Sequence, residues 1–480
     1  MSGIDLTQNV LKILSRTGRV MATADTDSIK EHTRGIYKEY ENRTKKSREL
    51  FERAKRVLPG GNSRTTIFWS PHPIYFTHGK GPLIYDLDGN AYLDFLVNYT
   101  SLIHGHAHPK ILEAIRNSAG RGTAAHLPTE GEIRLAELMC ERFASVERIR
   151  FGNSGTEATM NALRVARAHT GRDKIMKAEG AYHGTHLWAE VSHHPNLTNV
   201  GPIEAPNSLP ELGTPSSIAR DVVIYPFNNQ EITEKLFRSH REELAAVIVE
   251  PVMRTIPPEK GYLDFLREIT KENDVLLVFD EVICARISRG GAQEYYGVTP
   301  DLTAFGKIFG GGLPFGAFGG REDIMTVSDP SREKSIDHGG TFNANPVTMA
   351  AGIVATEMLT SEAINSLNSL GDLQRKGMER TLEELGVVAR LTGVGSYMQM
   401  HFTDEDVKDF RASARAKKSL NDPLYISLLN EGISMAPRIM TALSTPMSRR
   451  EIDTFINAFR KSVEHLRPLI KQTASNLVVG

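Results

Sequence analysis

The chain has 480 residues, and its 57 lysines and arginines nearly match its 58 aspartates and glutamates, which leaves a formal net charge of −1. This balance provides no field that would attract nucleic acid or an anionic membrane, and it favours a small-molecule partner. The only cysteines, Cys140 and Cys284, lack a C-x-x-C pairing, which argues against a disulfide framework or a thiolate zinc site.

The beginning of the chain is polar. Residues 1–30 contain no apolar run of the length that a signal peptide or a membrane span requires, so we expect a soluble, cytoplasmic protein. Residues 1–46 are interpreted as an N-terminal extension. A charge-rich run from Lys38 to Arg53 predicts an exposed helix. Residues 81–95, GPLIYDLDGNAYLDF, then predict a β-hairpin with a tight turn at residues 88–90.

The middle of the chain alternates amphipathic helical windows with short apolar runs. Continuous valine, isoleucine and leucine in such runs predicts strands covered on both faces, and therefore a largely parallel sheet. Beyond Asn345 a long helical stretch leads to VVARLTGVGSYMQMHF and GISMAP, which predict strands of a smaller α+β domain. The strand candidates of the middle region are RIRFGNSG, KIMKAEG, AAVIVEP, VLLVFDEV, LTAFGK and FGAFGG.

The segment FGNSGTEATMNAL predicts a strand, a turn and a helix. Backbone N–H groups at that helix N-terminus, together with the hydroxyls of Ser154 and Thr156 on either side of Gly155, would bind a phosphate. The same residue types form an ordinary helix cap, and that alternative stays open at this point. In EGAYHGTH, Tyr182 and His183 are predicted to end a strand and would offer an aromatic face to a planar ring, although tyrosines packed in a core are equally common.

Two charged residues end predicted strands further along. Asp280 follows five apolar residues, and a carboxylate at the end of such a strand requires a cationic partner. A helix cap or a structural ion pair would explain the residue equally well. Lys307 lies among glycines and apolar side chains in DLTAFGKIFGGGLPFGAFGG. A solvated surface lysine is the ordinary interpretation, but burial would lower its pKa and produce a usable amine. One helix and one strand fit between them, so both side chains are expected at the same edge of the sheet.

Together, a phosphate cup, an aromatic ring, a carboxylate for a heterocyclic nitrogen and an amine describe a site for pyridoxal phosphate (PLP). The histidines of HGHAHP and HGTHLWAEVSHHP have no ligand spacing such as H-E-x-x-H, so we expect no metal. A DNA-binding regulator is disfavoured because the extension is short and the chain has no basic surplus.

The motifs NSGTEATMNALRVAR, EGAYHGTH, IVEP, FDEV, FGKIFGGGLPFGAFGG and GGTFNANPVTMAAG resemble those of the class III aminotransferases, which are fold type I PLP enzymes. The likeness runs from roughly Val57 to Phe459, and it is strongest to glutamate-1-semialdehyde aminomutases and bacterial β-phenylalanine aminotransferases. It implies an α/β fold in which residues 111–345 form the large PLP-binding domain. The smaller domain would combine residues 47–110 with residues 346–480.

The resemblance also implies roles for individual residues. Lys307 would be the Schiff-base lysine, and Asp280 would contact the pyridine nitrogen. Thr341 would reach the phosphate of the neighbouring subunit, which implies a homodimer with shared active sites. The residues implied around the cofactor are Ser154, Gly155, Thr156, Tyr182, His183, Glu250 and Ile283, with Glu281 in a supporting role nearby.

The substrate side departs from the aminomutases. They carry a glycine-rich loop after YHG and a glutamate after an AP turn, whereas this chain reads WAEVSHHPNLTNVGPIEAPN and MAPRIMTALS, with Arg438. Ile283 stands where many class III members have glutamine. Arg64, by its likeness to an arginine of the β-phenylalanine enzymes, is expected to bind one carboxylate and Arg438 the other, because a guanidinium binds carboxylates bidentately. Phe68 and Trp69 are expected to line the pocket for the donor side chain.

The sequence therefore predicts ping-pong transamination from an amino acid, with a β-amino acid as the specific candidate, to a 2-oxo acid acceptor such as 2-oxoglutarate or pyruvate. An intramolecular aminomutase would have the same site and remains the alternative.

Overall fold

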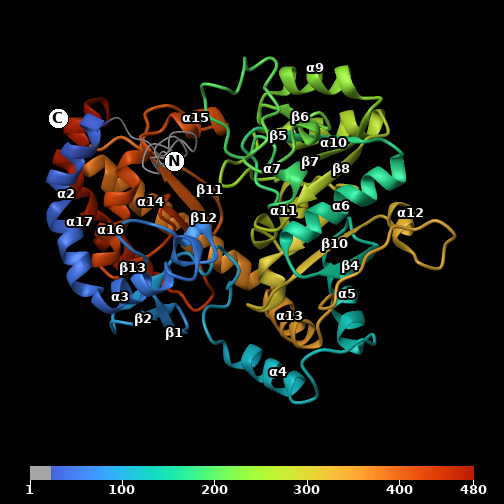
Figure 1. The fold of residues 1–480 in the computed structure, drawn as a ribbon, viewed down its shortest axis with the longest axis horizontal. Helices are drawn as coiled ribbons and strands as arrows, with labels where there is room; N and C mark the ends of the chain where they lie inside the picture. Colours follow the sequence, from blue (N-terminus) through green and yellow to red (C-terminus); the bar gives the residue numbers. More distant parts are fainter. Residues whose placement is uncertain (1–22, 480) are drawn as a thin grey trace, which may run out of the picture.

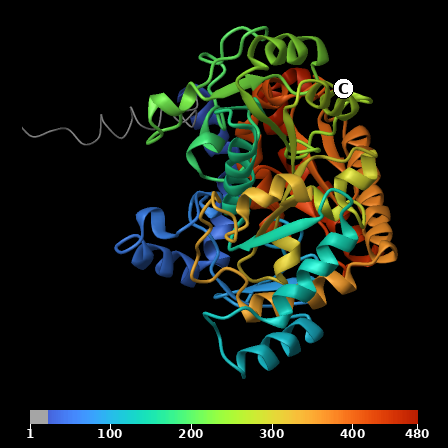
Figure 2. The same cartoon turned by 90° about the vertical axis from the view of Figure 1, so that its right-hand side faces the viewer.

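The structure is a computed structural model that describes residues 23–479; the first 22 residues of the predicted N-terminal extension lie outside the described residues. The chain forms two halves (Figure 1). The green, yellow and teal half contains the central part of the sequence, and the other half combines the blue N-terminal and the orange-red C-terminal segments. Seen from the side of the central half, its strands and helices stand in front of the red C-terminal helices (Figure 2).

The large domain is built on a seven-stranded sheet in the order β4-β10-β9-β8-β7-β5-β6. Strand β10 runs antiparallel to both of its neighbours, and the other pairs are parallel, which confirms the largely parallel sheet. All six predicted apolar runs form strands, and the sequence analysis missed only β6. The strands are β4 (Arg148–Gly152), β5 (Lys174–Ala178), β6 (Val222–Tyr225), β7 (Leu244–Val249), β8 (Leu276–Asp280), β9 (Leu302–Gly306) and β10 (Gly316–Gly320).

Helices cover both faces of this sheet, which explains why the strands β6, β7, β8 and β9 are mostly apolar. Successive residues of β8 show the alternation, since Leu277 packs into one buried cluster with α10 and Val278 into another with α6. The helices of this half are α4 (Pro109–Ala119), α5 (Glu130–Arg142), α6 (Gly155–Thr170), α7 (Leu187–Glu190), α8 (Ser216–Ala219), α9 (Gln230–His240), α10 (Tyr262–Glu272), α11 (Gly291–Tyr296), α12 (Glu322–Met325) and α13 (Pro346–Met358).

The small domain joins the two ends of the described chain. Strand β13 pairs in parallel with β3, with Ile433 opposite Leu93, so a C-terminal strand completes the sheet β1-β2-β3-β13. The predicted hairpin is the antiparallel β2–β3 pair. A second sheet has the order β11-β12-β14. The strands of the small domain are β1 (Phe76–Lys80), β2 (Leu83–Asp86), β3 (Ala91–Asp94), β11 (Arg390–Val394), β12 (Tyr397–His401), β13 (Ile433–Ser434) and β14 (Met440–Ala442).

The N-terminal helices differ from the exposed helix predicted for Lys38 to Arg53. The run divides into two helices at Thr44, and one face of α2 is buried against α16. Tyr40 is only 1% exposed, and its hydroxyl donates to His72 O at 2.6 Å. Charged residues dominate this run in the sequence, so the apolar stripe on one face of α2 was not predicted. The helices of the small domain are α2 (Thr23–Arg43), α3 (Lys45–Ala54), α14 (Ser361–Glu384), α15 (Phe410–Arg415), α16 (Asn421–Asn430) and α17 (Arg449–Thr473).

Within residues 23–479, no single helix has the length and apolar character needed to span a membrane, although α13 and α14 meet that test as a pair bent by 73°.

Candidate active site

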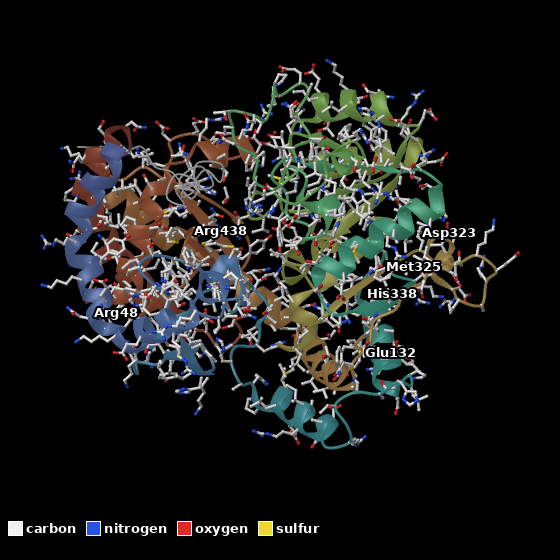
Figure 3. The ribbon with its side chains drawn as sticks, viewed as in Figure 1. Arg48, Glu132, Asp323, Met325, His338 and Arg438 are labelled. Carbon is white, nitrogen blue, oxygen red and sulfur yellow. The ribbon has the colours of Figure 1, made fainter. Side chains whose placement is uncertain are left out.

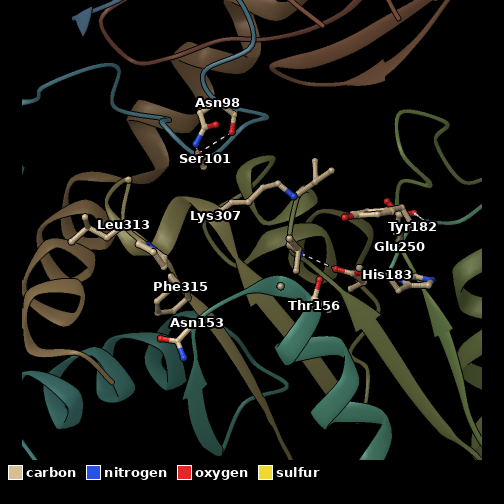
Figure 4. Close-up of a pocket in the computed structure, with 17 residues that line it drawn as sticks. Asn98, Ser101, Asn153, Thr156, Tyr182, His183, Glu250, Lys307, Leu313 and Phe315 are labelled. Atoms are coloured by element: carbon tan, nitrogen blue, oxygen red, sulfur yellow. Dashed lines mark hydrogen bonds and ion pairs between the residues drawn. The ribbon is translucent and has the colours of Figure 1, made fainter. Parts of the chain in front are cut away.

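A cavity of about 370 Å³ opens at the carboxyl ends of the large-domain strands, where ligands bind in open α/β sheets. Most of the predicted site residues meet here. Figure 4 shows Lys307 extending into the cavity, with Asn98 and Ser101 on one side and Thr156 on the other. The lining residues are Asn98, Ser101, Asn153, Gly155, Thr156, Tyr182, His183, Gly184, Glu250, Asp280, Val282, Ile283, Lys307, Gly312, Leu313, Pro314 and Phe315.

Lys307 directly follows β9, in a short 3₁₀ turn that spans Lys307–Gly310. Its φ of 50° lies in the left-handed region, which is unusual for a residue with a side chain and which aims the amine off the strand end. Burial lowers the pKa of Lys307, while the neighbouring carboxylates of Asp280 and Glu250 oppose that shift. The amine is therefore more available as a nucleophile than that of a surface lysine.

Asp280 is the last residue of β8 and lies opposite Ala304 of β9, so two paired strands bring it to the same sheet edge as Lys307. His183 Nδ1 donates to Asp280 Oδ2 at 2.8 Å, and the Val282 N–H donates to Oδ1 at 3.1 Å. The hydrogen bond to Asp280 fixes the orientation of the His183 imidazole. His183 Nε2 is buried without a partner among the described residues. The Asp280 carboxylate is thus held in a fixed orientation in the floor of the cavity.

The N-terminus of α6 faces the cavity, where Gly155 and Thr156 are among the lining residues. Ser154 is its cap, because Ser154 Oγ accepts from the Glu157 N–H at 3.1 Å. The N–H groups of Gly155 and Thr156 have no partner inside the helix and carry the positive end of its dipole. A Cβ added at Gly184 would lie 2.5 Å from Thr156 Oγ1, so this position requires glycine for the loop to approach the start of α6. The cap and the phosphate interpretations of this motif are therefore compatible.

The structure corrects the position of Tyr182 and His183. They do not end β5, which stops at Ala178, but lie on the loop that follows it. This loop is held by hydrogen bonds: Tyr182 N–H donates to Glu250 Oε1 at 2.9 Å, and Arg254 Nε donates to Gly180 O at 2.8 Å. The Arg254 guanidinium also lies 5.9 Å from the centre of the Tyr182 ring. Burial raises the pKa of Glu250.

A lysine that the sequence analysis missed supports the same loop. Lys177 of β5 is 0% exposed, and its Nζ donates to the carbonyls of Ala181, Ala189 and Val191 at 3.2, 2.6 and 2.8 Å. Burial lowers the pKa of Lys177 to about 7. The sequence KIMKA could have identified Lys177 as a buried lysine, because a lysine inside a buried strand requires internal hydrogen-bond acceptors.

Asn98 and Ser101 were also missed, and the backbone that presents them is unusual. Four consecutive residues, Val97, Asn98, Tyr99 and Thr100, have φ of 46°, 51°, 52° and 76°. The left-handed conformation costs about 1–2 kcal/mol per residue with a side chain. Glycine is absent from this turn, so nothing in the sequence VNYT signals a left-handed backbone.

Arg64 and Arg438 lie at the edges of this cavity rather than in its lining. Arg64 donates to Asn98 Oδ1 at 2.9 Å, and its guanidinium lies 5.5 Å from the centre of the Tyr99 ring. Arg438 lies at the junction of the two halves (Figure 3), where NH2 donates to Met440 Sδ and Nε is buried without a partner. Within the described part of the chain, neither arginine has a carboxylate partner within 4 Å.

Other predicted site residues lie elsewhere. The Trp69 indole packs on Tyr425 and donates to the Tyr40 hydroxyl at 3.2 Å, which makes it part of the small-domain core instead of a donor pocket. Phe68 is 40% exposed and packs near Phe51. Thr341 is exposed and lines a separate surface cavity.

Glu281, expected to support the cofactor, instead accepts from the N–H groups of Ala292 and Gln293 at 2.9 Å. It therefore caps the first turn of α11, away from the cavity. Ile283 does line the cavity, beside Val282.

The residues present fit PLP. The start of α6 is suited to its phosphate, the buried carboxylate of Asp280 to its ring nitrogen, and the Lys307 amine to its aldehyde. When bound, PLP supplies an electron sink for the carbanion formed at a substrate carbon.

Comparison with known proteins agrees with this chemistry. A curated relative, the glutamate-1-semialdehyde 2,1-aminomutase of Methanothermobacter thermautotrophicus, is 43% identical over 396 residues, which cover 82% of this chain and 92% of that protein. The solved structure of an omega-transaminase from Sphaerobacter thermophilus is 45% identical with a TM-score of 0.85, covering 88% and 98% of the two chains. A β-phenylalanine aminotransferase from Variovorax paradoxus is 34% identical with a TM-score of 0.84, covering 92% and 99%.

The family model of class III aminotransferases matches residues 69–462, which include the whole cavity and most of both domains. This chain therefore belongs to the class III aminotransferases, with the fold type I architecture, and is a PLP-dependent enzyme.

Proposed function

We propose that this enzyme transfers the amino group of a carboxylate-bearing amino acid to a 2-oxo acid, and that β-amino acids are among its donors. The observation that carries the proposal is the pairing of a buried amine with two arginines that lack acidic partners. Lys307 Nζ lies in the cavity, and Arg64 and Arg438 lie beside it without a carboxylate within the described residues. Guanidinium groups so placed suit the carboxylates of a donor and an acceptor.

The chain's own residues divide the chemistry. Lys307 Nζ would hold the cofactor in the resting enzyme, and the same amine, when free, would be placed to accept a proton from the substrate carbon that carries the amino group. Asp280, oriented by His183, keeps a negative charge on the floor of the cavity, which favours a protonated ring nitrogen. The loop held by Glu250 and Arg254 keeps Tyr182 over the site.

The second candidate is an intramolecular aminomutase of the glutamate-1-semialdehyde type. The names of the curated relatives support this reaction more strongly than transamination, beginning with the 43% identical aminomutase. The omega-transaminase and the β-phenylalanine aminotransferase support transamination, as does Arg438 in the MAPRIM segment. Because both reactions begin at the same lysine, the site geometry is common to them.

One experiment separates the two. The PLP-loaded enzyme is incubated with glutamate-1-semialdehyde alone, and with a panel of α- and β-amino acids in the presence and absence of 2-oxoglutarate or pyruvate. We expect amino-acid turnover that depends completely on an added 2-oxo acid. Conversion of glutamate-1-semialdehyde without any acceptor, together with an inactive donor panel, would establish the aminomutase instead.

We also propose that the active form is a cytoplasmic homodimer. Leu127, Ile133 and Phe342 are 66%, 59% and 59% exposed, and Leu127 lines the same surface cavity as Thr341. Ile133 and Phe342 directly follow the lining residues Glu132 and Thr341 in the chain, and exposed apolar side chains near one cavity favour a partner surface. The predicted contact of Thr341 with the neighbouring active site would be made across this face.

A further inference from the structure

The left-handed turn of residues 97–100 is the longest run of non-glycine residues at positive φ in the described chain, and it borders the cavity. Runs of four residues with side chains at positive φ are maintained only when their surroundings over-determine them, and such strain gathers at functional sites. Valine and threonine, which are β-branched, are among the residues least suited to this region. Thr100 Oγ1 is in addition buried without a partner among the residues described.

The surroundings do hold this turn on its inner side. Asp94 Oδ1 accepts from the N–H groups of Leu96 and Val97, both at 2.9 Å, and the Thr100 N–H donates to Leu96 O at 2.9 Å. Val97 and Thr100 are 0% exposed. Their burial points the two intervening residues, Asn98 and Tyr99, in the opposite direction.

Asn98 and Tyr99 both contact the segment that contains Arg64. Asn98 Oδ1 accepts from Arg64 NH1, the Tyr99 ring lies under the guanidinium, and the Tyr99 hydroxyl donates to Thr66 O at 2.5 Å. Asn98 is itself oriented by Ser101, whose Oγ accepts from Asn98 Nδ2 at 3.0 Å. Arg64 is otherwise an exposed residue in extended conformation just before the short 3₁₀ helix Thr65–Ile67, so these contacts set the direction of its side chain.

We propose that this turn is a substrate-recognition element in which Asn98 and Tyr99 hold Arg64 in place to receive a substrate carboxylate at the mouth of the Lys307 cavity. Asn98 is the positioning residue, since it contacts Arg64 and also lines the cavity. In a relaxed turn the long side chain of Arg64 would be free to move. The entropy lost on ordering it would then oppose substrate binding. This inference rests on the proposed function only in requiring a substrate with a carboxylate.

The test uses the PLP-loaded enzyme and 3-phenylpropionate, a carboxylate without an amino group, so binding is measured without turnover. The variants are Arg64→Ala, Asn98→Gly, Asn98→Ala and the double variant Arg64→Ala/Asn98→Gly. Asn228→Gly is the matched control, because Asn228 is also an asparagine at positive φ (64°) but lies away from the cavity. Calorimetric titration gives Kd, and thermal unfolding gives Tm.

We expect Asn98→Gly and Arg64→Ala each to weaken 3-phenylpropionate binding by about tenfold, the scale of one lost charge-assisted contact. The double variant should bind no more weakly than Arg64→Ala, because Asn98 acts through Arg64. Asn98→Gly should unfold about 1–2 °C above Asn98→Ala, since only glycine is relaxed at this φ. Asn228→Gly should bind like the wild type.

Kinetics supply a second readout that a purely structural role would not produce. For an amino donor with a carboxylate, Asn98→Gly should raise KM with little change in kcat, and the fold-increase in KM should be several times smaller for 1-phenylethylamine, which has no carboxylate. Wild-type binding of 3-phenylpropionate by Asn98→Gly, multiplicative losses in the double variant, or absence of binding by the wild type would each overturn the proposal. If the donor panel is inactive while the binding pattern holds, transamination fails and the recognition element stands.

Discussion

At the scale of single residues, the site depends on charges whose environment the fold controls. Lys307 has its pKa lowered by burial, and Asp280 accepts hydrogen bonds from both an imidazole and a backbone N–H. A buried amine beside a carboxylate held in place by hydrogen bonds is the combination that PLP chemistry requires. Each of these two residues leads to a separate prediction.

Lys307→Ala should abolish turnover and leave the fold and most cofactor binding intact, because the start of α6 and the Asp280 carboxylate do not depend on the amine. Turnover of the best donor and PLP content after gel filtration check this, with the far-UV circular dichroism spectrum as the folding control. Residual turnover near the wild-type rate would remove Lys307 from the chemistry.

Asp280→Asn should lower kcat by about two orders of magnitude or more, the typical loss when a preorganised charge is removed from an active site. The amide still accepts a hydrogen bond from His183 but carries no charge to favour the protonated ring nitrogen. Steady-state kinetics at saturating cofactor test this. A rate within twofold of the wild type would show that the carboxylate charge is not needed.

At the scale of elements, the loop after β5 depends on Lys177, whose Nζ satisfies three carbonyls. Lys177→Met should lower the free energy of unfolding by several kcal/mol, because roughly 1–3 kcal/mol is lost for each buried group left unsatisfied. It should also weaken PLP retention, since Tyr182 lies on this loop. The matched control is Lys174→Met, three residues earlier on the same strand, where the ammonium forms a partly exposed ion pair with Glu243.

The effect of Lys177 should depend on pH. Burial lowers the pKa of Lys177 from 10.5 to about 7, so the unfolded chain holds this proton more tightly than the folded protein does. The stability linked to this titration is present above about pH 10.5 and is lost as the pH falls towards 7. The Tm advantage of the wild type over Lys177→Met should therefore be larger at pH 9.5 than at pH 7. An advantage that grows as the pH falls would contradict this assignment.

At the scale of the whole molecule, the proposed dimer predicts that a charged residue on the apolar face separates the subunits. Leu127→Asp combined with Phe342→Asp should give a monomer in sedimentation velocity, with loss of activity and PLP together, because Thr341 could no longer reach the neighbouring site. Leu212→Asp is the control, since Leu212 is 94% exposed away from that cavity. A fully active monomer would leave Thr341 without a role across the interface.

Much of the fold and the centre of the site could be predicted from the sequence. Apolar runs identified six of the seven large-sheet strands, because strands buried on both faces are mostly apolar. Asp280 and Lys307 were placed at one sheet edge for a similar reason, since parallel strands bring their carboxyl ends together. These inferences depend on local sequence and on the few ways in which a parallel sheet can be connected.

Only the tertiary structure decided what depends on contacts between distant segments. Trp69 packs in the small-domain core because it contacts Tyr40 and Tyr425. These residues are far apart in the sequence, so no local pattern predicts the contacts. Lys177 found three carbonyls on a loop that folds back over its strand. The left-handed turn at VNYT contains no glycine that would predict it. Its conformation is imposed by hydrogen bonds to Asp94 and by the two residues buried on its inner side. The sequence thus determined which chemical groups reach the sheet edge, whereas packing decided which of the remaining side chains face the cavity.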